Sequence, residues 1–124
     1  LTLSESAATE WASAGVRVNT IAPGSIASSG LDTYDSKDTE FIRNQVAREI
    51  PLQRFGTEAE VSAAVVFLLS PAASFITGTC IRVDGGAPNA KPGWWELQPA
   101  QHNSAFNGFH RATLPAILDA TPSR

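Results

Sequence analysis

The amino-acid sequence of 124 residues contains no methionine, a single cysteine and few charged residues. One cysteine excludes an internal disulfide bond and a cysteine-rich zinc site. The 9 basic residues do not exceed the 12 acidic ones, so no excess of positive charge is available to neutralise the phosphates of a nucleic acid. No apolar run approaches the ~18 residues that a membrane-spanning helix needs. These absences argue against a nucleic acid or a membrane as partner.

The shortage of charge also bears on contacts with other protein. Charged residues make up 17% of the sequence, against about 25% in a typical soluble domain, so we expect part of the surface to face other protein. The sequence opens with Leu1-Thr2-Leu3, and neither an initiator methionine nor a signal peptide is recognisable. We therefore expect a cytoplasmic protein, of which this chain is one part of a longer polypeptide.

The first elements expected are a helix over residues 1–14 and a strand over residues 16–22. Gly15 suits the left-handed residue that ends a helix. The residues from 16 to 22 are rich in β-branched side chains, which is typical of a strand, and Pro23-Gly24 would end it. The helix has one face of apolar or small side chains at helical spacing: Leu3, Ala7, Trp11 and Ala14.

A second helix and a second strand follow further along the chain. Thr57 and Glu60 have the spacing of a capping box, so a helix is predicted from there to about Leu69. Its wide apolar face predicts burial on more than one side. Residues 79–83 are predicted to form the second strand, ended by residues 84–86. This order predicts a parallel βαβ unit of an α/β fold. Two strands are too few for a doubly wound sheet, so further strands are expected outside this chain.

Two segments differ from this regular pattern. Residues 25–50 begin as a polar loop, and helical spacing over residues 39–50 predicts a long excursion that contains a short helix. Residues 87–124 hold five of the eight prolines, two of the three tryptophans and both histidines. We expect this segment to be an extended arm that lies on other protein. No carboxylate has metal-ligand spacing to the histidines, so no metal site is predicted.

The best candidate site lies just beyond the first strand, because open parallel sheets bind ligands at the carboxyl ends of their strands. The segment Pro23-Gly24-Ser25-Ile26-Ala27-Ser28 offers free backbone amides, hydroxyl groups and a glycine that admits a ligand. The long excursion that follows it has the length of an active-site lid. The residues alone leave a second interpretation open, in which Pro23-Gly24 is only a turn and the serines are only solvated.

Five short motifs, taken in order, resemble the short-chain dehydrogenase/reductase family. They are residues 16–24 (VRVNTIAPG), 51–61 (PLQRFGTEAEV), 67–70 (FLLS), 75–78 (FITG) and 83–86 (VDGG). Their order and spacing are those of the family, and they cover residues 1–86. The resemblance implies the C-terminal part of a Rossmann-type, doubly wound parallel sheet, with its last two strands and flanking helices. Within it, residues 25–50 would be the substrate lid, and residues 87–124 would follow as the arm.

The resemblance also implies which catalytic parts this chain lacks. In the family, the glycine-rich turn, the catalytic serine and the Tyr-x-x-x-Lys pair would lie before Leu1. Tyr34 is the only tyrosine, and Asp38 stands four residues after it, so Tyr34 does not match that pair. We therefore predict an oxidoreductase as the parent protein. This chain alone, without the N-terminal half, would contain no catalytic residue and would be inactive.

The resemblance does carry over the nicotinamide end of a site for NAD(H) or NADP(H). The cofactor-binding residues would be Pro23, Gly24, Ile26 and Ser28. Among them, the backbone of Ile26 would bind the carboxamide, and the hydroxyl of Ser28 would stand where the family has a threonine. The substrate side would be formed by Ser25 at the reacting centre and by Leu31 and Tyr34 in an apolar pocket. Phe41 and Ile42 are expected to pack in the lid's own small core.

The resemblance leaves two substrate classes and one non-enzymatic role open. Residues 86–92 (GAPNAKP) and 106–112 (FNGFHRA) resemble citronellol/citronellal dehydrogenases, which implies NAD-dependent oxidation of a small apolar, terpenoid-like alcohol or aldehyde. Residues 67–78 also resemble peroxisomal trans-2-enoyl-CoA reductases, which use NADPH. The third possibility is a non-catalytic fragment or assembly module. The family's interfaces would involve both predicted helices and the second strand, which implies a homo-oligomer, either a dimer or a tetramer.

Overall fold

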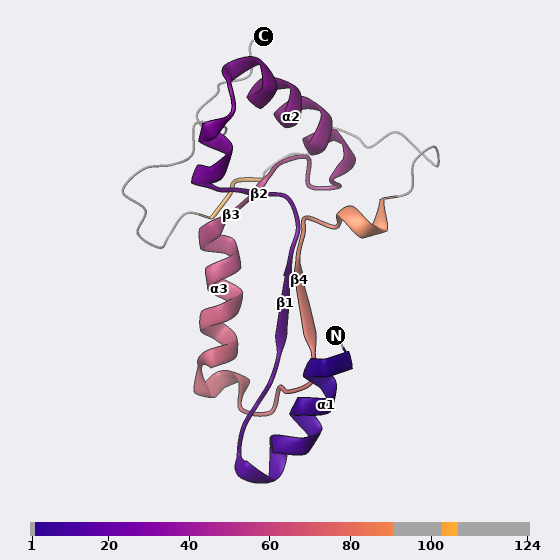
Figure 1. Ribbon diagram of the computed structural model, residues 1–124, viewed down its shortest axis with the longest axis vertical. Helices are drawn as coiled ribbons and strands as arrows, with labels where there is room; N and C mark the ends of the chain where they lie inside the picture. Colours follow the sequence, from indigo (N-terminus) through magenta and orange to yellow (C-terminus); the bar gives the residue numbers. More distant parts are fainter. Residues whose placement is uncertain (1, 91–102, 107–124) are drawn as a thin grey trace.

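The computed structural model describes residues 2–90 and 103–106, and Figure 1 shows an elongated arrangement along two central strands. Strands β1 (Thr20–Pro23) and β4 (Cys80–Val83) run side by side along the middle, with helix α3 (Glu58–Leu69) beside them. Helix α1 (Thr2–Trp11) lies at one end, and α2 (Ser36–Glu49) lies at the other, where both strands have their carboxyl ends.

The central strands confirm the predicted parallel pairing. Thr20 pairs with Cys80 and the register continues to Pro23 opposite Val83. The first strand begins at Thr20 and not at residue 16 as predicted. Before Thr20, side-chain hydrogen bonds replace the regular backbone pairing of a strand. Asn19 donates from Nδ2 to the Ile76 carbonyl at 2.9 Å and accepts from the Thr79 amide at 3.2 Å.

Helix α1 confirms the predicted helix and its end. A 3-10 turn over Ala12–Ala14 follows the α-helical part, and Gly15 ends it in the left-handed region with φ 74°. Only Ala8 is buried, beside Gly78. The face predicted from helical spacing points outward, since Leu3 is 84% exposed and Trp11 is 49% exposed.

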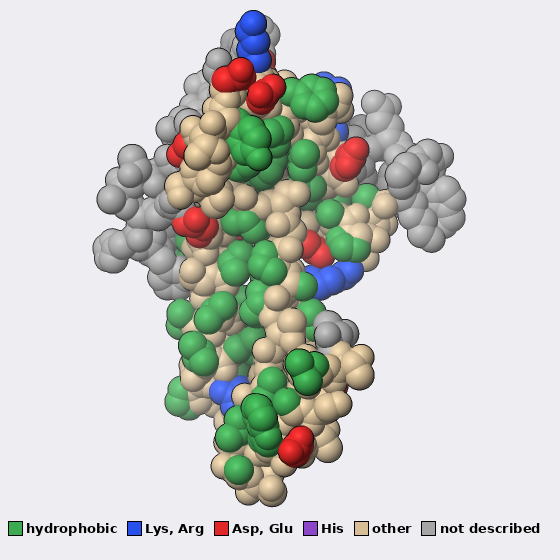
Figure 2. All heavy atoms as spheres, viewed as in Figure 1, with side chains coloured by type: hydrophobic (Ala, Val, Ile, Leu, Met, Phe, Trp, Pro, Cys, Tyr) green, Lys and Arg blue, Asp and Glu red, His purple; other side chains and the backbone are tan. Residues whose placement is uncertain are grey.

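Helix α3 has the predicted start but a less buried body. Thr57 and Glu60 form the predicted capping box, with the Glu60 amide donating to Thr57 Oγ1 at 3.1 Å and the Thr57 amide to Glu60 Oε2 at 2.9 Å. Ala59 and Leu68 are buried. The expectation of burial on more than one side is wrong for the described chain, because a second row of apolar side chains is exposed: Val65, Val66, Phe67 and Leu69. Figure 2 shows hydrophobic side chains along this surface.

The predicted excursion forms a small unit of its own. Two short strands that the sequence did not predict pair in parallel and close it: β2 (Ile26–Ala27) at its start and β3 (Gly56–Thr57) a few residues after its end. A 3-10 helix over Ser29–Thr33 and helix α2 lie between them. The helix begins three residues earlier than predicted, because Asp35 accepts hydrogen bonds from the amides of Lys37 and Asp38.

A small hydrophobic core holds this unit together. Ala27 and Phe55 are buried at its centre, and the partly buried side chains packed on them are Leu31, Ile42 and Val46. The expectation for Ile42 is thus confirmed, whereas that for Phe41 is wrong, since Phe41 is 64% exposed. Helical periodicity identified both residues as apolar positions on α2 but did not show which of them turns inward.

The predicted arm is described only in part. A 3-10 turn over Ala87–Asn89 follows the second central strand, and residues 103–106 lie against residues 52–60. The tryptophans Trp94 and Trp95, and both histidines, lie outside the described residues. Within the described part, no helix is long and apolar enough to span a membrane.

Candidate functional site

The carboxyl ends of β1 and β4 open onto a cavity of about 540 Å³. This is the edge at which parallel sheets bind ligands. Three segments meet there: Ser25 after β1, the loop that runs from Pro51 into the start of α3, and the end of β4 with its following turn. The lining residues are Ser25, Pro51, Leu52, Arg54, Gly56, Glu60, Arg82, Val83, Asp84, Gly85 and Gly86.

The turn after β1 is built by close backbone packing. The Gly24 amide donates to the Val83 carbonyl at 2.9 Å, and a Cβ on Gly24 would lie only 2.7 Å from Asp84 Cα. Glycine is thus required here for the contact between β1 and the end of β4. The next residue, Ser25, lines the cavity and accepts a hydrogen bond through its carbonyl from the Gly56 amide at 3.0 Å.

The other predicted cofactor residues lie around this turn and outside the cavity lining. Pro23 is exposed at the end of β1. Ile26 is half-buried against Gly56, where an added Cβ would come within 2.7 Å of Ile26 Cδ1. Ser28 is half-buried and accepts from the Leu31 amide through its carbonyl at 3.0 Å. Their assignment to the cofactor site, and that of Ile26 and Ser28 to the nicotinamide carboxamide, stays a prediction.

The predicted substrate residues separate in the structure. Ser25 faces the cavity, whereas Leu31 packs on the Ala27–Phe55 core of the excursion. Tyr34 follows the 3-10 helix and is 54% exposed, away from the cavity lining. Of the three, the structure therefore brings only Ser25 to the carboxyl ends of the central strands.

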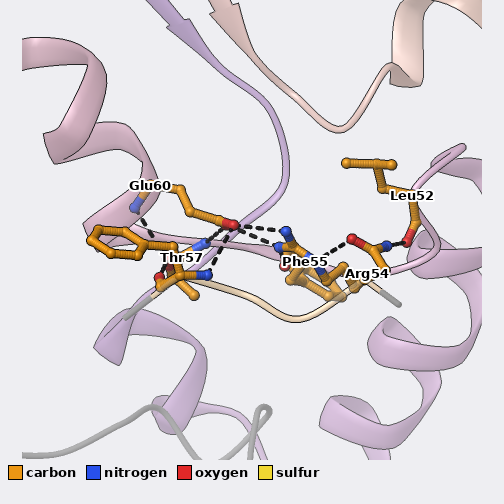
Figure 3. Close-up of polar contacts among 7 residues, drawn as sticks. Leu52, Arg54, Phe55, Thr57 and Glu60 are labelled. Carbon is orange, nitrogen blue, oxygen red and sulfur yellow. Dashed lines mark hydrogen bonds and ion pairs between the residues drawn. The ribbon is translucent and has the colours of Figure 1, made fainter. Parts of the chain in front are cut away.

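Part of the cavity wall is an ion pair between Arg54 and Glu60, which point toward each other in Figure 3. Arg54 Nη2 lies 2.7 Å from Glu60 Oε1, and Arg54 Nη1 lies 2.9 Å from Glu60 Oε2. Such a two-point contact fixes the plane of the guanidinium as well as its position. The same carboxylate accepts hydrogen bonds from the amides of Thr57 and Phe106.

The surroundings of Glu60 favour its charged form. Burial by itself would raise the pKa of Glu60. The hydrogen bonds from Arg54, Thr57 and Phe106, together with the positive charge of Arg54, outweigh this effect and hold the pKa below its ordinary value of 4.5. The cavity wall therefore carries a carboxylate that stays ionised and paired at neutral pH.

The turn after β4 forms the floor of the cavity. Asp84 Oδ1 accepts from the Gly86 amide at 2.9 Å, and Asp84 Oδ2 lies 3.6 Å from Arg82 Nε. Gly85 and Gly86 have φ values of 63° and 85°, which side chains rarely adopt. The Gly85 carbonyl accepts from the Leu52 amide at 3.2 Å and so joins this turn to the loop before α3.

Sequence reasoning did not assign Arg54, Glu60, Arg82 or Asp84 to the site. For Arg54 and Glu60, the sequence did contain a usable pattern. Glu60 is the acidic residue of the predicted capping box, and Arg54 stands shortly before that box. In the described residues, no group of three or more His, Cys, Asp or Glu side chains could hold a metal ion.

The chemistry that this arrangement supports is binding and orientation. Ser25 contributes a polar residue to the cavity lining, and the carboxylates of Glu60 and Asp84 and the guanidinium groups of Arg54 and Arg82 contribute charged ones. The two arginines of the lining each lie beside a carboxylate. Among the described lining residues there is no tyrosine, histidine, cysteine or lysine to transfer a proton.

Comparison with known proteins places these features in a family. The sequence profile described as "Enoyl-(Acyl carrier protein) reductase" matches residues 1–88. A tropinone reductase homolog of Arabidopsis thaliana is 48% identical over 84 residues, which are 68% of this chain and 30% of that protein. A peroxisomal 2,4-dienoyl-CoA reductase of Danio rerio is 46% identical over 81 residues, 64% of this chain and 26% of that protein.

Solved structures agree with the sequence relatives. A proposed short-chain alcohol dehydrogenase of Sinorhizobium meliloti superimposes with a TM-score of 0.62 at 38% identity, covering 73% of this chain and 35% of that one. The likeness confirms the predicted α/β fold with parallel strands as part of a larger domain. This chain spans about a third or less of the length of the curated relatives named above.

Proposed function

Because the chain belongs to the short-chain dehydrogenase/reductase family, we propose that the protein containing it is an NAD(P)-dependent oxidoreductase, and that this chain supplies part of its substrate site. The observation that carries the proposal is the cavity of about 540 Å³ at the carboxyl ends of β1 and β4, with Ser25 on its wall. A cavity of this size suits a small organic substrate.

Within the proposed site, this chain's residues bind, orient and exclude water. The nicotinamide cofactor, when bound, supplies or accepts the hydride. Ser25 offers a hydroxyl to the substrate oxygen or to the cofactor amide, and the Gly24 turn keeps that hydroxyl at the end of β1. The excursion leaves the cavity at Ser25 and returns at Pro51, with α2 above the strand ends, where it would keep water from the reaction (Figure 1).

We propose a small apolar alcohol or aldehyde as the substrate. Pro51, Leu52 and Val83 give the cavity apolar wall, and the arginines are engaged by carboxylates. The terpenoid-like choice, with NAD, rests on the resemblance of residues 86–92 and 106–112. Most of those residues lie beyond the part matched by the family profile.

An enoyl-CoA reductase is the second candidate, and a specific relative favours it. The Danio rerio protein of 46% identity is named a peroxisomal 2,4-dienoyl-CoA reductase. The two candidates differ in cofactor and direction. Steady NAD reduction with citronellol, and no NADPH oxidation with an enoyl-CoA, would support the first for the full-length protein. The opposite result would support the second candidate. If the full-length protein has neither activity, the result would favour a non-catalytic assembly module.

The role of Ser25 can be tested in the same protein. Ser25→Ala should lower kcat/KM by about two- to tenfold, the expected effect of losing one hydrogen bond at the reacting centre. Ser29→Ala is the matched control, because Ser29 is exposed and outside the cavity lining. Equal kinetics for the two variants would contradict the assignment of Ser25 to the site.

We also propose a homo-oligomer, assembled through the outer faces of α1 and α3. Supporting this, apolar side chains on both helices are exposed in the described chain, among them Leu3, Trp11, Val66, Phe67 and Leu69. An apolar surface of this kind is typical of protein interfaces.

A further inference from the structure

The first and last residues of the segment 103–106 both form hydrogen bonds with residues 52–60, which comprise the loop before α3 and the start of that helix. We propose that these four residues form a clip that fastens the loop 52–60 in place, and that Asn103 is a positioning residue for the cavity wall formed by Leu52 and Arg54. The part of this inference that concerns substrate rests on the proposed function above. The part that concerns the fastening does not.

Asn103 bridges the two sides of an unusual backbone position. Its Oδ1 accepts a hydrogen bond from Arg54 Nε at 3.0 Å, and its Nδ2 donates to the Leu52 carbonyl. Between these partners lies Gln53, whose φ of 51° is in the left-handed region. A residue other than glycine is strained there, and such a conformation persists when its surroundings hold it. Asn103 provides that support from both neighbours of Gln53.

Phe106 completes the hydrogen bonding at the start of α3. Its amide donates to Glu60 Oε1 at 3.2 Å, and its carbonyl accepts from Thr57 Oγ1 at 2.5 Å. Thr57 Oγ1 also accepts from the Glu60 amide, so the hydroxyl acts as acceptor within the capping box and as donor to the clip. The same residues that begin α3 therefore form the other attachment point of the clip.

The clip matters for the cavity because it contacts residues that line it. Leu52, Arg54 and Glu60 all face the cavity, and all are hydrogen-bonded by residues 103–106 (Figure 3). Arg54 is held by Glu60 through its terminal nitrogens and by Asn103 through Nε. Loss of Asn103 would leave the guanidinium paired but would release Nε and the Leu52 carbonyl, so this wall would lose its fixed shape.

Hydrogen exchange of the full-length protein tests the fastening directly. Asn103→Ala should speed exchange of the Phe106 amide, and of amides in residues 52–57, by about tenfold, because two hydrogen bonds are lost. Ser104→Ala is the matched control, since Ser104 is exposed in the same short segment. Equal exchange in the two variants would overturn the clip.

Kinetics of the same variants test the positioning role. We expect Asn103→Ala to raise the KM for the organic substrate by about three- to tenfold while kcat and the KM for the nicotinamide cofactor stay unchanged. Asn103→Asp keeps the acceptor toward Arg54 but sets a carboxylate oxygen against the Leu52 carbonyl, so its KM should rise at least as much as that of Asn103→Ala if the Leu52 contact shapes the wall. A uniform loss of kcat in both variants, or no change in KM, would overturn the positioning role even if exchange confirms the clip. Absence of any oxidoreductase activity in wild type would instead count against the proposed function.

Discussion

Gly24 shows at the residue scale how one missing side chain sets the geometry of the site. Its sequence context suggested a glycine that admits a ligand. The structure gives it a different role, because the space for a Cβ is taken by Asp84. The close packing of β1 on the end of β4 therefore fixes the position of Gly24. The position of Ser25, the next residue, is fixed by the same packing.

Gly24→Ala should therefore destabilise the protein by about 1–3 kcal/mol, because the new Cβ would meet backbone that cannot turn aside. Gly30→Ala is the control, since a Cβ there would meet only Ser28 Oγ, at an ordinary 3.5 Å. Urea unfolding of both variants would measure the difference. If Gly24→Ala and Gly30→Ala unfold at the same urea concentration, the close contact between Gly24 and Asp84 does not limit stability.

Glu60 gives a prediction for pH at the same scale. Its pKa is lower in the folded protein than its ordinary value of 4.5, so folding favours the charged carboxylate. The resulting stabilisation is fully present above pH 4.5 and is lost as pH falls through the folded-state pKa. The partners responsible for the lowering are Arg54 and the amides of Thr57 and Phe106.

The free energy of unfolding of wild type should thus exceed that of Glu60→Gln by a constant amount at neutral pH. The difference should shrink as the pH falls below 4.5. Glutamine keeps the size of the side chain and is accepted at this position of a capping box. Urea unfolding at a series of pH values measures the difference, and a gap that does not change with pH would contradict the lowered pKa.

Local signals predicted the helices better than the short strands, and the reason is visible at the scale of elements. The capping box of α3 and the end of α1 at Gly15 depend on neighbours within a few residues, so the sequence alone identified them. Strands β2 and β3 have two residues each, which is too short for any periodicity, and their pairing depends on residues thirty positions apart.

The residues of the candidate site also differ in how far the sequence alone could predict them. Ser25 could be predicted from its place after the first strand. The capping box identified Glu60 as a residue at the helix start, but the place of Arg54 and Glu60 in the cavity wall depends on how the loop before α3 folds back over the strand ends. The outward direction of Tyr34 and Phe41 likewise depends on packing within the excursion, which hydrophobic pattern does not specify.

The start of α2 supplies a prediction at the element scale. Asp35 Oδ1 accepts from the amides of Lys37 and Asp38 at 3.0 and 2.9 Å. Asp35→Ala should lower the free energy of unfolding by about 1 kcal/mol, the usual effect of losing an N-cap, whereas Asp35→Asn should keep most of it. Urea unfolding measures both, and an equal loss in the two variants would show that the cap does not act through these hydrogen bonds.

At the scale of the whole molecule, the main feature is the apolar surface that α3 leaves exposed in the described chain. Leu69 is 77% exposed at the end of α3, and Val66 and Phe67 lie exposed just before it. A hollow of about 370 Å³ between α3 and the residues that lead into β1 is lined in part by Val65, Leu68 and Leu69. Both features agree with the low fraction of charged residues and with the proposed assembly.

Leu69→Glu should weaken that assembly by at least about tenfold in dissociation constant, because a charge would be buried at an apolar contact. Arg48→Glu is the control, an exposed charge reversal on α2. Sedimentation velocity of the full-length protein across a concentration series would show the shift. An unchanged distribution for Leu69→Glu would rule out this end of α3 as part of the interface.

The pairing of Thr20 with Cys80 also has a consequence for the timing of synthesis. The two residues stand 60 positions apart in the chain, since 80 − 20 = 60. At the ~5–20 residues per second of a ribosome, β1 is made about 3–12 s before its partner exists. During that interval the amides and carbonyls of β1 that later pair with β4 can bond only to water or to other chains, and an unpaired strand edge is a site for pairing with other chains. The whole segment between the strands, which includes α2 and α3, thus sets a waiting time for the nascent protein.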